Sequence, residues 1–180
     1  MSVLSGPFAI SCVLLAGAGV LKAWKPGDTA NALRTVGLPL SYTASRILVR
    51  AFGAVEAVVA VVALVTGNPV AAAVVATSYL AFAGFVVVAL RRGAAIASCG
   101  CFGKVDTPPS IVHVVLDLCF AGVAIAVVFA GDVALADVLR TQPLAGVPFV
   151  LLLVIGVYLV FLAFTALPKT MAAGRGSVIA

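Results

Sequence analysis

The sequence predicts an all-α membrane protein, a transmembrane bundle of four to five helices. Of its 180 residues, 64% are hydrophobic and 9% are charged, whereas a soluble domain carries roughly 25% charged residues. Several uncharged stretches approach the roughly 20 residues that cross a bilayer as a helix. Valine is abundant, but an open sheet cannot exist in lipid and these segments are too long for barrel strands.

The first expected span is Val3–Leu21, which is uncharged and ends at Lys22, Trp24 and Lys25, a basic and aromatic flank typical of the membrane interface. No basic stretch precedes it, so we expect a retained helix rather than a cleaved signal peptide. The whole chain is expected to form one multi-pass domain, residues 1–170, with a short tail, 171–180. Its spans are expected near 3–21, 48–66, 70–90, 110–130 and 147–167.

The connections between the spans carry turn signals. Asp28–Arg34 is expected to form a short interfacial helix that Gly37 and Pro39 bring to an end. The apolar stretch Ala51–Leu90 must double back at Thr66–Pro69, a cluster of turn-forming residues. Pro108-Pro109 precedes the fourth span, because proline does not continue a helix.

Basic residues predict the orientation, since cytoplasmic loops hold the excess of lysine and arginine. With five spans and the N-terminus outside, Arg140 alone falls on the outer side. The other side holds all the remaining basic residues: Lys22, Lys25, Arg34, Arg46, Arg50, Arg91, Arg92, Lys104, Lys169 and Arg175. We therefore expect residues 93–109 to lie on the cytoplasmic side of the membrane. Insertion and anionic lipid account for the net charge of +5, so no nucleic-acid partner is expected.

Ser98–Gly103 is the leading candidate for chemistry, because it places Cys99 and Cys101 two residues apart in a polar gap between apolar spans. Gly100 relaxes the backbone so that the two sulfurs can approach each other. A disulfide in so small a ring would be strained, and strained exposed disulfides tend to be oxidising. Arg91, Arg92 and Lys104 lie nearby and would favour the reactive thiolate.

Two other interpretations of these thiols stay open. In one, they are small apolar residues in a glycine turn. In the other, Cys99 and Cys101 bind metal with Asp106 and His113, but zinc sites usually place two to four residues between paired thiols, so no metal is expected.

These residues resemble the MauE family, which is related to the DoxX-like membrane proteins. The resemblance rests on Cys-Gly-Cys-Phe-Gly after an Arg-Arg pair, on Gly-Val-Leu-Lys after the first span, on Asn31–Pro39 and on a glutamate in the second span, and covers roughly residues 10–125. The resemblance implies a redox-associated helical protein of a bacterial-type inner membrane. In the family, MauE is thought to help mature the disulfide-rich small subunit of methylamine dehydrogenase, alongside a thioredoxin-like partner.

The predicted orientation conflicts with that role, because such subunits mature in the periplasm while the charge count places Cys99 and Cys101 inside. Three alternatives stay open: the charge rule fails here, electrons cross the membrane, or the client is cytoplasmic. The sequence carries no evident cofactor motif, and a quinone is left open as the electron acceptor.

Other polar residues lie inside the expected spans. Glu56 would pair with Arg50 or Arg46, or carry protons if thiol oxidation is coupled to a quinone. His113 and Asp117, four residues apart, share a helix face. In one interpretation His113 deprotonates Cys101 while Asp117 orients the His113 ring. In the other, His113 and Asp117 only satisfy each other's hydrogen-bonding groups inside the bundle.

Cys12 and Cys119 lie in apolar spans, where lone cysteines usually act as small hydrophobes. A relay between them is an alternative. The expected function is thiol–disulfide exchange by Cys99 and Cys101, with a thioredoxin-like or other redox protein as partner. Competing interpretations are a non-enzymatic scaffold for a redox enzyme and a small-molecule transporter coupled through Glu56.

Overall fold

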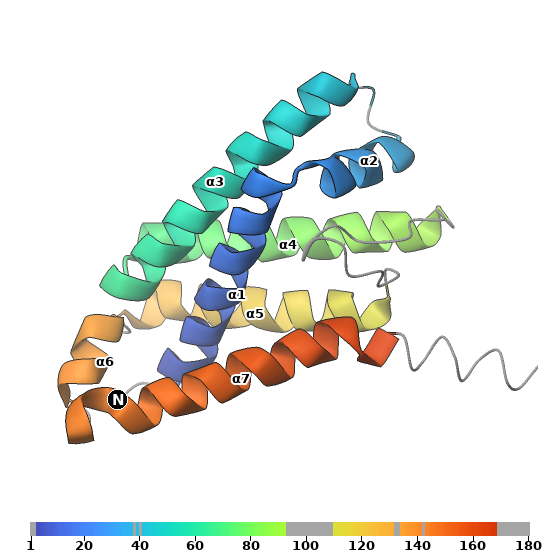
Figure 1. Cartoon of the computed structure of the whole chain (residues 1–180). Helices are drawn as coiled ribbons and strands as arrows, with labels where there is room; N and C mark the ends of the chain where they lie inside the picture. Colours follow the sequence, from blue (N-terminus) through green and yellow to red (C-terminus); the bar gives the residue numbers. More distant parts are fainter. Residues whose placement is uncertain are drawn as a thin grey trace, which may run out of the picture.

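The computed structural model describes residues 3–37, 39, 41–92, 110–131, 134–141 and 143–168, and Figure 1 shows how their helices are arranged. Within this part of the chain, five helices are long and apolar enough to cross a membrane and no strand forms, which confirms the predicted all-α membrane bundle. The elements are α1 Ser5–Trp24, α2 Gly27–Thr35, α3 Tyr42–Thr66, α4 Pro69–Arg91, α5 Ile111–Ala130, α6 Leu135–Thr141, the 3₁₀ turn η1 Pro143–Gly146 and α7 Val147–Thr165.

The hairpin between α3 and α4 turns where the sequence predicts. Gly67 ends α3 with a φ of 62°, a left-handed conformation that glycine adopts without a steric penalty. The Asn68 side chain then caps α4, because its Oδ1 accepts hydrogen bonds from the backbone N–H groups of Val70 and Ala71 at 2.8 and 3.1 Å. Pro69 follows at the first helical position, where its missing N–H costs nothing.

Helix α1 lies across the α4–α5 pair and meets α3 at very short range (Figure 1). The contact is between two glycines: a Cβ added to Gly19 would lie 2.6 Å from the carbonyl oxygen of Gly53, and one added to Gly53 would lie 2.7 Å from that of Gly19. Only glycine permits such an approach, as is common where helices pack in membranes. The two backbones are thereby held close enough for side chains one turn away to meet.

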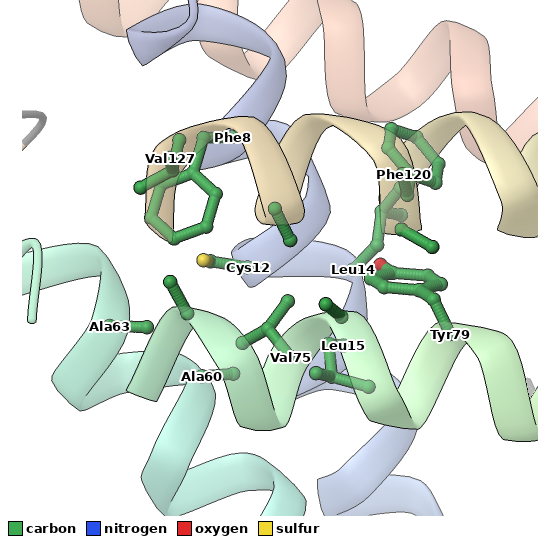
Figure 2. Close-up of a cluster of buried hydrophobic side chains, with 14 of the residues drawn as sticks. Phe8, Cys12, Leu14, Leu15, Ala60, Ala63, Val75, Tyr79, Phe120 and Val127 are labelled. Atoms are coloured by element: carbon green, nitrogen blue, oxygen red, sulfur yellow. The ribbon is translucent and has the colours of Figure 1, made fainter. Parts of the chain in front are cut away.

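The main hydrophobic core forms where α1 meets α3, α4 and α5. Figure 2 shows Cys12 of α1 pointing into this cluster, between α4 and α5, with Val75 and Tyr79 on α4 and Phe120 on α5. The Tyr79 hydroxyl donates a 2.7 Å hydrogen bond to the backbone carbonyl of Ser11, which ties α4 to α1 in the middle of the bundle.

The two ends of the bundle differ in charge. One end is formed by the end of α1, α2, the start of α3, the end of α4 and the start of α5, and we call it the basic end. Among the described residues, its basic side chains are Lys22, Lys25, Arg34, Arg46, Arg50, Arg91 and Arg92. The opposite end has Arg140 of α6 as its one described basic residue.

Two helix boundaries and one connection depart from the sequence-based expectation. Helix α1 continues to Trp24 rather than ending at Leu21, because Lys22 is buried and paired instead of marking the interface. Helix α3 begins at Tyr42, earlier than the expected residue 48, where the Ser41 hydroxyl accepts a capping bond from the N–H of Ala44. The connection before α7 contains helix α6, which the sequence analysis did not predict.

Candidate functional site: a buried ion pair and a histidine–aspartate face

Helix α3 packs against the rest of the bundle through one narrow buried face, a stripe along its length. Its buried residues recur at intervals of three or four: Ser45, Val49, Gly53, Glu56, Ala60 and Ala63. That spacing defines one face of an α-helix. Glu56 therefore points into the protein, on the face that packs against α1, rather than toward lipid.

Glu56 forms an ion pair with Lys22 of α1. The Lys22 Nζ atom donates a 2.7 Å hydrogen bond to Glu56 Oε2, and the two side chains are 3% and 2% exposed. The same ammonium lies 3.8 Å from the ring centroid of Phe82 on α4, a cation–π contact. Glu56 Oε1 is buried and has no hydrogen-bond partner in the described part of the chain.

The partner of Glu56 differs from the arginines that the sequence analysis named. Arg46 and Arg50 lie off the buried stripe of α3, and both line an outer groove with Pro26. The Arg50 guanidinium donates instead to the backbone carbonyl of Ala23, at the end of α1. The expected pairing of Glu56 with Arg46 or Arg50 is therefore wrong, because helix periodicity places those side chains on another face.

Lys22 was missed as a site residue because its position at the end of an apolar run is also typical of an interfacial anchor. A signal was present: Gly19 precedes Lys22 by three residues, and Gly53 precedes Glu56 by three residues. A glycine contact between two helices brings side chains one turn away into reach of each other. A lone acid in a long apolar stretch also needs a buried cation as partner.

His113 and Asp117 lie on one buried face of α5, as predicted, and each is 5% exposed. The His113 Nδ1 atom is 2.9 Å from the hydroxyl of Ser110, the residue that precedes α5. Among the described contacts, Ser110 rather than Asp117 is thus the group that orients the imidazole. Both side chains line a small cavity of about 20 Å³.

The two polar pairs are neighbours inside the basic half of the bundle. Phe82 lines the small cavity with His113 and Asp117, and its ring faces the Lys22 ammonium. Helix α7 closes the far side with Phe164, whose ring centroid is 5.5 Å from that of His113. Lys22, Glu56, His113 and Asp117 are the buried titratable side chains of the described membrane helices, apart from the thiol of Cys12 and the hydroxyl of Tyr79.

The four cysteines fall into different settings. Cys99 and Cys101 lie outside the described residues, but Arg92 and Ser110, which bound their segment, both stand at the basic end. Cys12 and Cys119 are free thiols; Cys12 is buried in the core, whereas Cys119 is exposed on α5. This geometry does not support a relay between Cys12 and Cys119. Within the described ranges, no three His, Cys, Asp or Glu side chains gather as a metal would require.

The fold and these residues define a multi-pass α-helical membrane protein with a buried, charged centre at one end. Comparison with protein families gives the narrower assignment: the family of methylamine utilisation protein MauE matches residues 2–130. The chain belongs to the MauE family and is a membrane protein of the kind associated with methylamine utilisation. No curated protein and no solved structure matches it. Helices α6 and α7, and with them Phe164, lie beyond the matched region.

Proposed function

We propose that this protein carries out thiol–disulfide exchange through Cys99 and Cys101, and assists disulfide formation in a partner redox protein. The observation that carries the proposal is the position of the two described residues that bound the dithiol segment. Arg92 and Ser110 both stand at the basic end, in the half of the bundle that also holds Lys22 and Glu56. Membership of the MauE family supports the same function, with the small subunit of methylamine dehydrogenase as the proposed client and a thioredoxin-like protein as a further partner.

The proposed exchange is balanced between two dithiols. A thiolate of the client attacks one sulfur of the Cys99–Cys101 disulfide and forms a mixed disulfide, and the second client thiolate then releases it. The client gains a disulfide, and Cys99 and Cys101 receive two electrons and two protons. In this direction His113 is proposed to return a proton to Cys101, and in the reverse direction to act as its base; its ring is oriented by Ser110 at 2.9 Å. Arg91 and Arg92 at the end of α4 would favour the thiolate form.

We further propose that the basic end faces the cytoplasm of a bacterial-type cell. Seven described basic residues stand at this end and one at the other, in keeping with the positive-inside rule. With that orientation, either the client is cytoplasmic or electrons cross the membrane before they reach a periplasmic client.

Thiol trapping in cells tests the exchange. Cells are quenched in acid, and the free thiols of the full-length protein are then alkylated with a mass-shifting maleimide. We expect a fraction of the protein with Cys99 and Cys101 protected. In the Cys99→Ser variant the Cys101 thiolate can still attack the disulfide of an oxidised partner, and the mixed disulfide should accumulate because no second thiol resolves it. Cys119→Ser is the matched control, because Cys119 is an exposed free thiol on α5 and its loss should change neither result.

Fully reduced protein under every condition, with no mixed disulfide in the Cys99→Ser variant, would overturn the exchange proposal in favour of a scaffold. Orientation has its own test, in a variant whose only cysteine is Cys101. An impermeant maleimide added to whole cells should leave Cys101 unlabelled, and labelling from outside would reverse the proposed orientation.

A further inference from the structure

A second cavity, of about 240 Å³, lies between α3 and α4 at the basic end. The two helices diverge from their turn at Gly67, and α2 lies beside the wide end of the resulting V (Figure 1). The walls of the cavity are mostly apolar and include three phenyl rings, those of Phe52 on α3 and of Phe82 and Phe85 on α4. Leu33 and Thr29 of α2 line the cavity toward the membrane surface.

The cavity opens toward the lipid. Phe52 and Leu48 of α3 are 46% and 51% exposed, and Ala81 of α4 is also exposed, although all three line it. A ligand can therefore enter from the bilayer between α3 and α4. The volume suits a substituted ring, since a dry apolar cavity of about 150 Å³ already binds benzene.

Among the residues that the structure describes, one charged side chain lines this cavity, and it is Lys22. An ammonium has three N–H donors, and the hydrogen bond that the described residues show for Lys22 goes to Glu56. Lys22 is 3% exposed, so its remaining N–H groups have little access to water. A ligand with a carbonyl oxygen at the inner end of the cavity would accept a hydrogen bond from it.

We infer that the cavity between α3 and α4 binds the ring of a membrane quinone, with Lys22 donating to a ring carbonyl and the phenyl rings packing against its faces. The ammonium already has Glu56 as an acceptor and Phe82 as a cation–π partner. A lipid acyl chain that fills the apolar walls would offer the remaining N–H groups of Lys22 no further acceptor, whereas a quinone carbonyl would. A quinone is soluble in the bilayer, planar, and carries carbonyl oxygens, so it matches the lateral opening, the aromatic walls and the buried cation together.

The inference that the cavity binds a quinone stands on the cavity alone. The quinone's role as electron acceptor rests in addition on the proposed function. In that role the thiols of Cys99 and Cys101 are oxidised to a disulfide, and their two electrons and two protons reduce the quinone to the hydroquinone. The chain permits the encounter. Phe85 lies seven residues before Arg92 in sequence, about 10 Å along a helix. Seven further residues lead to Cys99, and such a length of chain reaches at most about 25 Å.

Photolabelling tests the binding site without relying on the thiols. Full-length protein with Cys99→Ser and Cys101→Ser, in lipid nanodiscs, is irradiated with an azido-ubiquinone of short tail, and the labelled peptides are identified by mass spectrometry. We expect labels on α2, α3 and α4 around the cavity, and competition by decylubiquinone. In the Ala81→Phe variant, which fills the cavity from α4, labelling should fall at least about tenfold, equivalent to about 1.4 kcal/mol of binding free energy.

Ala73→Phe is the matched control, because Ala73 is exposed on α4 and does not line this cavity. It should leave labelling unchanged. Lys22→Met combined with Glu56→Gln keeps the interior neutral while removing the donor, and should weaken competition by decylubiquinone about tenfold or more.

Three results would overturn the inference: labels located mainly elsewhere, no effect of Ala81→Phe, or equal competition by a decyl-benzene without carbonyls. The last of these would make a lipid chain the occupant. Saturable quinone labelling in a protein whose native Cys99–Cys101 pair is never oxidised would instead refute the proposed function and leave the binding site standing.

Discussion

The Lys22→Met substitution offers the sharpest test of the buried centre. Methionine has a similar length but no charge, so it leaves Glu56 in the bundle with neither carboxylate oxygen paired. Breaking one side of a buried ion pair costs about 3–5 kcal/mol, and loss of the cation–π contact with Phe82 adds about 0.5–2 kcal/mol. Since net stabilities are only about 5–15 kcal/mol, this change should remove a large share of the stability.

The free energy of unfolding is measured in mixed micelles by titration with a denaturing detergent, with helix content followed by circular dichroism. Lys25→Met is the matched control, because Lys25 is exposed one turn further along and its loss should change stability by less than about 0.5 kcal/mol. Lys22→Met with Glu56→Gln removes the unpaired charge as well, and should recover more than half of the loss. If Lys22→Met and Lys25→Met prove equally mild, the ion pair is not buried as described.

Three further predictions concern other parts of the bundle. Gly53→Ala should destabilise the protein by about 1–3 kcal/mol in the same titration, because its Cβ would lie 2.7 Å from the carbonyl oxygen of Gly19. Gly84→Ala is the control and should not destabilise it, because nothing lies within 4 Å of a Cβ at that position. Equal effects of the two substitutions would refute the close helix contact. In folded protein lacking Cys99 and Cys101, N-ethylmaleimide should modify exposed Cys119 but not Cys12, and mass spectrometry that finds both modified would contradict the burial of Cys12. Arg92→Ala should speed amide hydrogen exchange in α2 by at least about tenfold. The reason is that the Arg92 guanidinium donates to the carbonyl of Val36 at the end of α2, and a charged hydrogen bond contributes about 1.5–3 kcal/mol. Unchanged exchange would show that this bond does not hold α2.

The sequence predicts the membrane helices well because each of them carries its own signals. Apolar length identifies the membrane spans, and Gly67, Asn68 and Pro69 mark the hairpin turn through local backbone chemistry. These signals depend on neighbours along the chain. The fold class therefore follows from the amino-acid order with little help from tertiary structure.

The centre of the site is less accessible to such reasoning, because it depends on which faces of separate helices meet. Glu56 is conspicuous in sequence, but its partner is set by the Gly19–Gly53 contact, which no single segment reveals. Ser110 likewise takes the place beside His113 that spacing alone would give to Asp117. Cys99 and Cys101, found from sequence, stay a prediction because they lie outside the described residues.

Helix α7 adds a fifth membrane crossing to the four that precede it in the described chain. The helices within the region matched by the MauE family cross the bilayer four times and would return the chain to the side on which it started. The fifth crossing carries the chain back, so that α7 ends near the start of α5, where Phe164 lies against His113. A partner that binds the end of α7 would therefore lie on the same side of the membrane as Arg92 and Ser110, the described residues that bound the dithiol segment.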